Sequence, residues 1–252
     1  MNSNMKNTIV VTADIIIGVY LAIAVTALNS PDEKASVCPE VKIDIAEPRG
    51  EGFMNTAEVK HLLTSQNLYP TAQPPELIST RKMEEALEKS PFVDKAECYK
   101  TQSGHVCISL RQRLPVMHVM ADNGENYYID NHCEILPASN MTSNQIIATG
   151  RINQSYARQI LAPIANKIHD NRFWQSQIVQ LNILGDGSIE MVPRVGDHIV
   201  HLGGPTDIDQ KLNRLRKFYK HGLSQAGWNK YERISVEFGN QIICKKKLRR
   251  SF

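Results

Sequence analysis

The 252-residue sequence has none of the short motifs by which many enzymes are identified. It contains no GxSxG turn for a nucleophilic serine and no HExxH helix for zinc. Its one glycine pair, Gly203-Gly204, is followed by proline and not by the lysine and Ser/Thr of a phosphate-binding loop. The eight histidines are scattered, and none is expected to act as a base or a ligand. These absences favour a non-enzymatic protein over an enzyme.

Cysteine is scarce, with five residues and no CxxC pair. Two His–Cys neighbours occur, His105 with Cys107 and His132 with Cys133, but neither has the two-pair spacing of a zinc site. We therefore expect no metal and no cofactor. Cys98 and Cys107 fall on opposite arms of an expected hairpin and could form a disulfide in an oxidising compartment, although buried free thiols are the favoured state.

Basic charge is concentrated at one end of the chain and is not spread over a face. The net charge is +3, and the segment CKKKLRR near the C-terminus carries five basic residues, without which the net charge is −2. Aromatic residues make up only 6% and are not interleaved with basic ones, so no nucleic-acid partner is expected. Residues 247–252 are interpreted as a solvated basic tail.

There is only one long hydrophobic run, residues 8–28, which carries a single charge, Asp14. A helix of 21 residues rises about 30 Å, enough to cross the hydrocarbon core of a bilayer. The run therefore predicts a transmembrane anchor, with residues 1–7 as a short cytoplasmic head and residues 29–40 as a linker to an extracytoplasmic part. The alternative is a cleaved signal peptide with Val25 and Ala27 before the cut, but the run is longer than the usual apolar core of about 7–15 residues.

Residues 41–115 predict a first globular unit in the order strand, helix, helix, strand, strand. Alternation marks a strand over 41–46, and Asn55 followed by Glu58 resembles a capping box that opens a helix. A second helix begins near Ser79 and stops before Pro91. Two strands, 93–100 and 105–112, are joined by a turn at 102–104, and Pro115 closes the unit.

Residues 116–246 predict a second unit that is mostly β. Short strands are expected at 116–120, 127–130, 146–149, 178–184, 189–193 and 198–202. One helix is expected over 155–170, kinked at Pro163, and a stronger one after Thr206. Aspartates beside turn residues are expected to accept hydrogen bonds from local backbone; they are Asp122, Asp130, Asp186 and Asp197.

The end of this unit predicts either one last strand or a hairpin around Gly239-Asn240, from segments 233–238 and 241–246. In the first segment Ile234, Val236 and Phe238 alternate with polar residues. A chain-terminal strand is often a sheet edge, and an exposed edge can recruit another strand. The alternative is an ordinary inner strand with one buried face.

Several segments resemble one family in their order and spacing. They are the anchor, the strand-helix-helix-strand-strand unit with its exit QRLPV, then YYID, FWQSQIVQL, VPRVGDHIVHLG, KLNRLRKFY, GWNKYERISVEF and NQIIC. Together they resemble the cell division protein FtsQ, also called DivIB, in the form found in Bacteroidetes-like bacteria. The resemblance implies an α+β fold: a single N-terminal transmembrane helix, a POTRA domain over 41–115, and a mostly antiparallel β domain with two helices over 116–246.

The resemblance also implies a function. Members are non-enzymatic inner-membrane scaffolds at the division septum that link early and late division proteins and bind FtsB and FtsL, two single-span coiled-coil proteins. FtsB is expected to add a strand to the last strand of the β domain, and the POTRA unit to serve recruitment of the scaffold to the division machinery. The implied partner-binding residues are Tyr231, Ile234, Val236 and Phe238, supported by Phe218 or Tyr219. The alternative is a POTRA-bearing module of another envelope secretion or assembly system.

One position departs from the family pattern. The turn after residues 127–130 usually holds a glycine, and here Cys133 stands at that point. A tight turn with positive φ is therefore not expected, and a wider loop is predicted.

Overall fold

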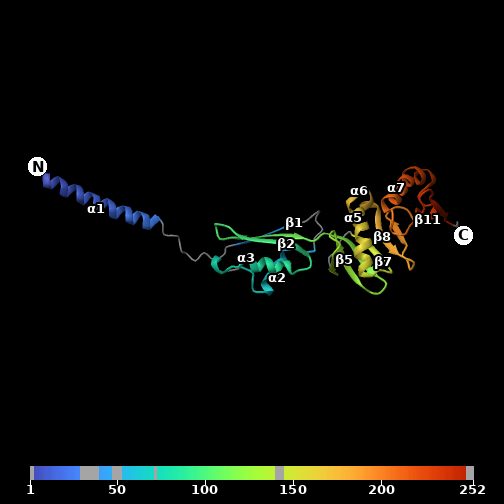
Figure 1. Ribbon diagram of the computed structural model, residues 1–252, viewed down its shortest axis with the longest axis horizontal. Helices are drawn as coiled ribbons and strands as arrows, with labels where there is room; N and C mark the ends of the chain where they lie inside the picture. Colours follow the sequence, from blue (N-terminus) through green and yellow to red (C-terminus); the bar gives the residue numbers. More distant parts are fainter. Residues whose placement is uncertain (1–2, 29–39, 47–52, 71–72, 140–144, 248–252) are drawn as a thin grey trace.

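The computed structural model describes residues 3–28, 40–46, 53–70, 73–139 and 145–247 (Figure 1). Most of the proposed linker over 29–40, the basic tail after Lys247 and the first two residues of the head lie outside the described residues. The described part consists of one N-terminal helix and two β-sheets, one of three strands and one of nine.

The N-terminal helix α1 runs from Ser3 to Leu28 and contains the whole hydrophobic run. The helical part of the anchor prediction is therefore confirmed. The membrane-crossing part is not: across the described ranges, no helix combines the length and the apolar content that crossing a membrane requires.

The three-stranded unit has the order expected from the sequence. Its elements are β1 (Val41–Ala46), α2 (Thr56–Ser65), the 3₁₀ turn η1 (Pro75–Leu77), α3 (Thr80–Glu88), β2 (Val93–Lys100) and β3 (Val106–Gln112). The sheet order is β1-β3-β2, with β1 parallel and β2 antiparallel to the central strand. Helices α2 and α3 lie along the same side of this sheet (Figure 1).

Local sequence signals account for this unit. The Asn55 side chain accepts a hydrogen bond from the Glu58 N–H, and the Glu58 carboxylate accepts one from the Asn55 N–H, which confirms the capping box. The buried faces of the helices and strands then form one core. Its fully buried members include Val59, Leu63, Met83, Leu87, Val106 and Leu110.

Two cysteines of this unit point to opposite faces of the sheet. Cys98 is buried and pairs across from Ile108, whereas the half-buried Cys107 pairs across from Tyr99. Because side chains one position apart in register lie on opposite faces, the two thiols do not meet. Both are free, as the sequence favoured.

The second unit is a nine-stranded sheet in the order β12-β11-β10-β9-β8-β7-β4-β5-β6. Its strands are β4 (Pro115–Ala121), β5 (Asn126–Asp130), β6 (Ile135–Pro137), β7 (Ile146–Gly150), β8 (Ile178–Ile183), β9 (Ile189–Pro193), β10 (Ile199–Gly203), β11 (Tyr231–Ser235) and β12 (Ile243–Lys246). The expectation of a mostly antiparallel sheet holds only in part. The pairs β4–β7, β7–β8 and β10–β11 are parallel, so the sheet is mixed.

Helical crossovers explain two of the parallel pairs, since parallel neighbours need a long connection. One crossover joins β7 to β8 and contains α4 (Gln154–Tyr156), a π-helical turn η2 (Ala157–Leu161), α5 (Ala162–Asp170) and α6 (Arg172–Gln177). The other joins β10 to β11 and contains α7 (Ile208–Phe218), a second π-helical turn η3 (Tyr219–Leu223) and α8 (Ser224–Ala226). The irregularity expected at Pro163 takes the form of η2 just before it, whereas α6 was not predicted.

The two sheet units meet through a cluster of aromatic side chains, of which Phe53 and Tyr128 are buried. The Phe53 ring lies 4.9 Å from the Phe92 ring and 5.0 Å from the Tyr128 ring, measured between centroids. Beside them the buried Gln112 amide makes two hydrogen bonds of 2.8 Å with the backbone N–H and C=O of Met54. The Phe53–Tyr128 contact therefore joins the first unit to β5 of the second, and the Gln112 bonds hold the Phe53–Met54 segment on β3.

Candidate partner-binding edge

The nine-stranded sheet ends at β12 on one side and at β6 on the other. Strand β11, which contains Ile234, lies between β10 and β12 and is hydrogen-bonded on both sides. The interpretation of segment 233–238 as the terminal edge strand is therefore wrong, and the hairpin alternative is correct. The reason is that β12 adds one more antiparallel strand beyond the turn at 239–240.

The residues implied by the family resemblance are mostly interior. Ile234 and Val236 have no solvent-exposed surface, and Tyr219 is also buried. The Val236 N–H donates to the His201 carbonyl at 3.0 Å, and its carbonyl accepts from the Arg214 guanidinium at 2.7 Å. These three residues therefore belong to the core beneath the edge and are not available to a partner.

The other three implied residues lie nearer the surface. Phe238 is 50% exposed just beyond β11. Tyr231 and Phe218 are half-buried, and their rings lie 6.4 Å apart between centroids. Of the six residues, Phe238 is therefore the one that presents most of its side chain to solvent.

The edge strand β12 has backbone groups and side chains that face away from the rest of the sheet and are open to a partner. The Lys247 N–H donates to the Lys230 carbonyl at 3.1 Å, so Lys247 directs its backbone towards β11. Because alternate residues of a strand direct their backbone groups to opposite sides, Cys244 and Lys246 direct theirs away from β11. Ile243 is 49% exposed at the start of the strand. Within the described part of the chain, no strand lies beyond β12.

A charged network crosses the strands next to this edge. The Arg233 guanidinium lies 2.8 Å from the Glu190 carboxylate and 3.0 Å from His201 Nδ1. His201 Nε2 lies 3.5 Å from the Glu237 carboxylate. This network was not predicted from the sequence, because its members are adjacent only through the non-local pairing of β9, β10 and β11.

Aromatic packing supports the same edge from the helix side. The His198 imidazole Nε2 lies 2.8 Å from the Tyr219 hydroxyl, and the Trp228 ring packs against both. Burial lowers the pKa of His198 and raises the pKa of Tyr219, since each charged form would be poorly solvated there. Both groups are therefore neutral at pH 7.

This lowered pKa predicts that acid weakens the fold. The unfolded chain binds a proton at His198 near its ordinary pKa of about 6.5, whereas the folded chain resists protonation until lower pH. The stability that His198 contributes is thus complete above about pH 6.5 and is lost as the pH falls towards the lowered folded-state pKa, by at most about 1.4 kcal/mol per pH unit.

Urea unfolding of wild type and His198→Gln at about pH 7.5 and about pH 5.5 measures this effect, because glutamine does not titrate. The difference in free energy of unfolding between the two proteins should shrink at the lower pH. A difference that stays constant between the two pH values would contradict the assignment of the acid effect to His198.

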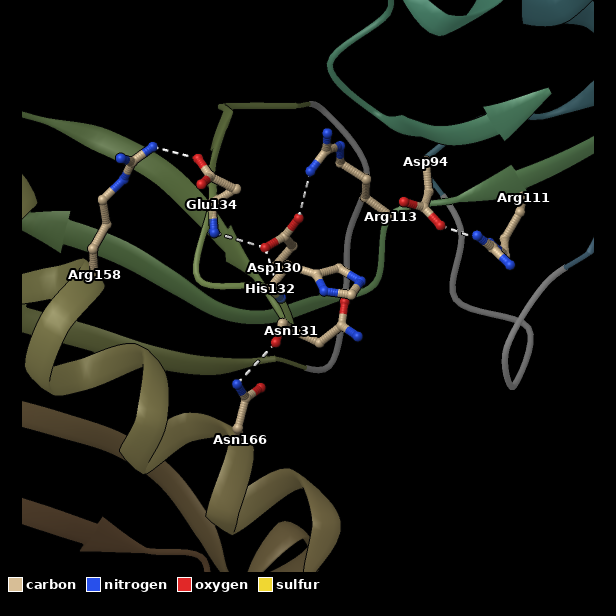
Figure 2. Close-up of polar contacts among 9 residues, drawn as sticks. All are labelled: Asp94, Arg111, Arg113, Asp130, Asn131, His132, Glu134, Arg158 and Asn166. Atoms are coloured by element: carbon tan, nitrogen blue, oxygen red, sulfur yellow. Dashed lines mark hydrogen bonds and ion pairs between the residues drawn. The ribbon is translucent and has the colours of Figure 1, made fainter.

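A second polar group joins the two units at the end of β5 (Figure 2). Asp130 is fully buried, and its carboxylate accepts hydrogen bonds from the Arg113 guanidinium at 2.9 Å and from the backbone N–H of His132 and Glu134 at 2.9 and 2.7 Å. The prediction that this aspartate serves a local turn is confirmed. Arg113 adds a link from the segment between β3 and β4.

The turn held by Asp130 corrects one expectation. Cys133 adopts φ 65°, and its N–H donates to the Asp130 carbonyl at 3.0 Å, so the turn is tight although glycine is absent. The wider loop predicted here is wrong. The hydrogen bonds to the Asp130 side chain offset the cost of the left-handed conformation at a non-glycine residue.

The described residues contain no group of three or more His, Cys, Asp or Glu side chains arranged to hold a metal ion. The pairs His105–Cys107 and His132–Cys133 are thus not part of such a group within those ranges. The edge formed by β12 combines outward backbone groups with the exposed Ile243, and the charged network lies on the strands beside it.

Family comparisons agree with this architecture. Residues 36–111 match the model of a POTRA-like domain, which covers the three-stranded unit. Residues 114–245 match the model described as FtsQ/DivIB, C-terminal related, which covers the nine-stranded sheet. No curated protein matches the chain. Because the second match spans more than half of the sequence, the chain belongs to the FtsQ/DivIB C-terminal-related family, with a POTRA-like domain preceding that region.

Proposed function

We propose that this protein is a non-enzymatic scaffold of the bacterial division machinery and that β12 is where its principal partner binds. The partner class that fits is an FtsB-like single-span coiled-coil protein, bound together with an FtsL-like one. The family membership suggests the division machinery, and the outward backbone groups of Cys244 and Lys246 suggest the mode of binding.

Strand addition at β12 is favoured by several properties of the edge. An added strand would form main-chain hydrogen bonds with Cys244 and Lys246, and these supply affinity for an extended segment. The Lys245 ammonium lies 2.5 Å from Glu232 and the Lys247 ammonium 2.9 Å from Asp197, so the strand is held against its neighbours by ion pairs. Exposed Ile243 and Phe238 offer apolar contact at the same end of the sheet.

Five of the six residues implied by the family resemblance have a place in this proposal, four of them as supports of the edge and one as a contact. Ile234, Val236 and Tyr219 would set the position of β11 and therefore of β12, while Phe238 would touch the partner directly. Tyr231 pairs opposite Lys246, the last residue of β12, and would fix that end of β12 in place.

The test is a proline at the edge with a matched control. Lys246→Pro removes an outward N–H without removing a hydrogen bond to β11, and Lys246→Ala removes the same side chain while keeping the N–H. Binding of the FtsB-like protein of the same organism, measured by calorimetry, should weaken about tenfold or more in the proline variant and stay within about threefold of wild type in the alanine variant.

Unchanged affinity in Lys246→Pro, with an intact circular dichroism spectrum, would refute strand addition at β12. Imaging of the full chain in dividing cells gives a second readout of the same proposal. Signal should gather at the site of constriction, whereas signal spread evenly over the envelope would favour the alternative, a POTRA-bearing module of another envelope system.

A further inference from the structure

A cavity of about 380 Å³ lies away from β12, where the beginnings of β4 and β7 meet the connection between α5 and α6. Its polar lining comes from Gln145, His169, Arg172, Gln175, Ser176 and Arg194, and its apolar lining from Val116 and Ile146. The volume falls within the range of about 300–1,000 Å³ that is usual for small-molecule sites. None of these residues belongs to the β11–β12 edge or to the Asp130 turn. We call this cavity the basic pocket.

The charge of the basic pocket has one sign. Two arginines line it, and no acidic residue does. Arg172 has no ion pair among the residues that the structure describes, and neither has Arg194. The carboxylate nearest in sequence, Asp170, lies 3.3 Å from His169 Nδ1, but its side chain is 80% exposed and does not line the cavity.

Arg194 is positioned before any ligand arrives. Its backbone N–H donates to the Gln177 carbonyl at 2.6 Å, and its Nε donates to the Ser176 carbonyl at 3.2 Å. The Nε bond leaves the two terminal amino groups of the guanidinium for another acceptor, and a planar fork suits the paired oxygens of a carboxylate or a phosphate.

Arg172 is positioned by the helix that carries it. The Asn171 side chain accepts hydrogen bonds from the N–H groups of Phe173 and Trp174, which fixes the first turn of α6. Trp174 is 2% exposed and anchors that turn in the core. Arg172 therefore lines the pocket from a fixed backbone position, with an exposed side chain whose charge is not paired with a described neighbour.

We propose that the basic pocket binds a compact anion with two acidic groups, such as a diphosphate or a di- or tricarboxylate. Arg172 and Arg194 supply the charge, and the amides of Gln145 and Gln175 and the Ser176 hydroxyl supply neutral hydrogen-bonding groups around it. Two guanidinium groups at one cavity match two acidic groups on one ligand. This site is separate from the partner edge and does not depend on the proposed scaffold function.

The experiment titrates the purified full chain with inorganic pyrophosphate and, separately, with citrate, at low ionic strength, by isothermal titration calorimetry. The two probes distinguish phosphate from carboxylate chemistry. Arg172→Gln and Arg194→Gln should each weaken binding of the preferred probe about tenfold, as expected for loss of one charge-assisted pair. Arg81→Gln is the matched control, because it makes the same charge change on an 87% exposed side chain of α3, outside the pocket.

Weakening by both pocket variants, with wild-type binding by Arg81→Gln, supports the site. Equal weakening by all three would show that the anion responds to net charge alone, and absence of heat with both probes would overturn the proposal. Because Arg194 also donates to backbone, its variant is checked by thermal unfolding. Arg172→Gln, which breaks no hydrogen bond in the described structure, keeps the test decisive if Arg194→Gln is unstable.

Discussion

Asp130→Ala is expected to lower the free energy of unfolding by about 3–5 kcal/mol, the usual cost of removing one partner of a buried ion pair. The carboxylate is fully buried and accepts hydrogen bonds from the Arg113 guanidinium and from two backbone N–H groups. Alanine would leave those three donors unpaired, and Arg113 is only 29% exposed. It would also release the turn in which Cys133 holds a positive φ.

Asp94→Ala provides the matched control, and both aspartates are shown in Figure 2. Asp94 pairs with Arg111 at 2.6 Å, but the Arg111 side chain is 62% exposed. Loss of this ion pair should therefore lower the free energy of unfolding by no more than about 1 kcal/mol. Urea unfolding of the two variants gives the comparison. Similar losses in both would mean that the Asp130 group contributes no more than a surface pair.

The same comparison bears on how the two units are joined. Arg113 lies in the segment between β3 and β4, and the Phe53, Phe92 and Tyr128 rings pack beside the connection. A single cooperative unfolding transition in wild type that separates into two in Asp130→Ala would show that this group couples the POTRA-like unit to the nine-stranded sheet.

Local signals in the sequence were sufficient for the POTRA-like unit. The capping box at Asn55 and the i, i+4 spacing of Val59 and Leu63 identify α2 from neighbours in the chain alone. Strand alternation likewise places β1 and β2. These elements depend on interactions between residues close in the sequence, so the local sequence is enough to predict them.

Local sequence could not predict which strands lie side by side in the nine-stranded sheet. The alternation around Ile234 and Val236 indicates a strand with one buried face, and both inner strands and edge strands have such a face. Whether β11 lies inside the sheet or at its edge is therefore decided only by its pairing with β10 and β12. The basic pocket has the same origin. Arg172 and Arg194 are 22 positions apart and line one cavity only because β8 and β9 pair beside α6.

Cys133 illustrates a limit of another kind. A residue type that disfavours positive φ led to the expectation of a wider loop, yet the Asp130 carboxylate stabilises the tight turn. Propensity describes one residue in isolation, whereas the turn depends on an acceptor three positions earlier and on Arg113, 20 positions earlier.

Gly150→Ala is expected to cost more than a change of backbone preference alone. Gly150 ends β7 at φ 99°, and a Cβ there would lie 2.1 Å from the Ile183 carbonyl oxygen of β8. That oxygen is also the acceptor for the Arg151 N–H at 3.0 Å, so it cannot withdraw without loss of a hydrogen bond. The expected loss is about 3 kcal/mol or more, combining backbone strain with a clash between the ends of two interior strands.

Gly187→Ala separates these two contributions, because Gly187 has a similar φ of 82° in the turn before β9 but open space around the added Cβ. Its expected loss is about 1–2 kcal/mol, from the left-handed backbone alone. Urea unfolding of both variants measures the difference. Equal losses would contradict a close approach of β7 to β8 at this point. If Gly150→Ala loses at least about 1 kcal/mol more, the close approach of Gly150 to Ile183 is what requires glycine at the end of β7.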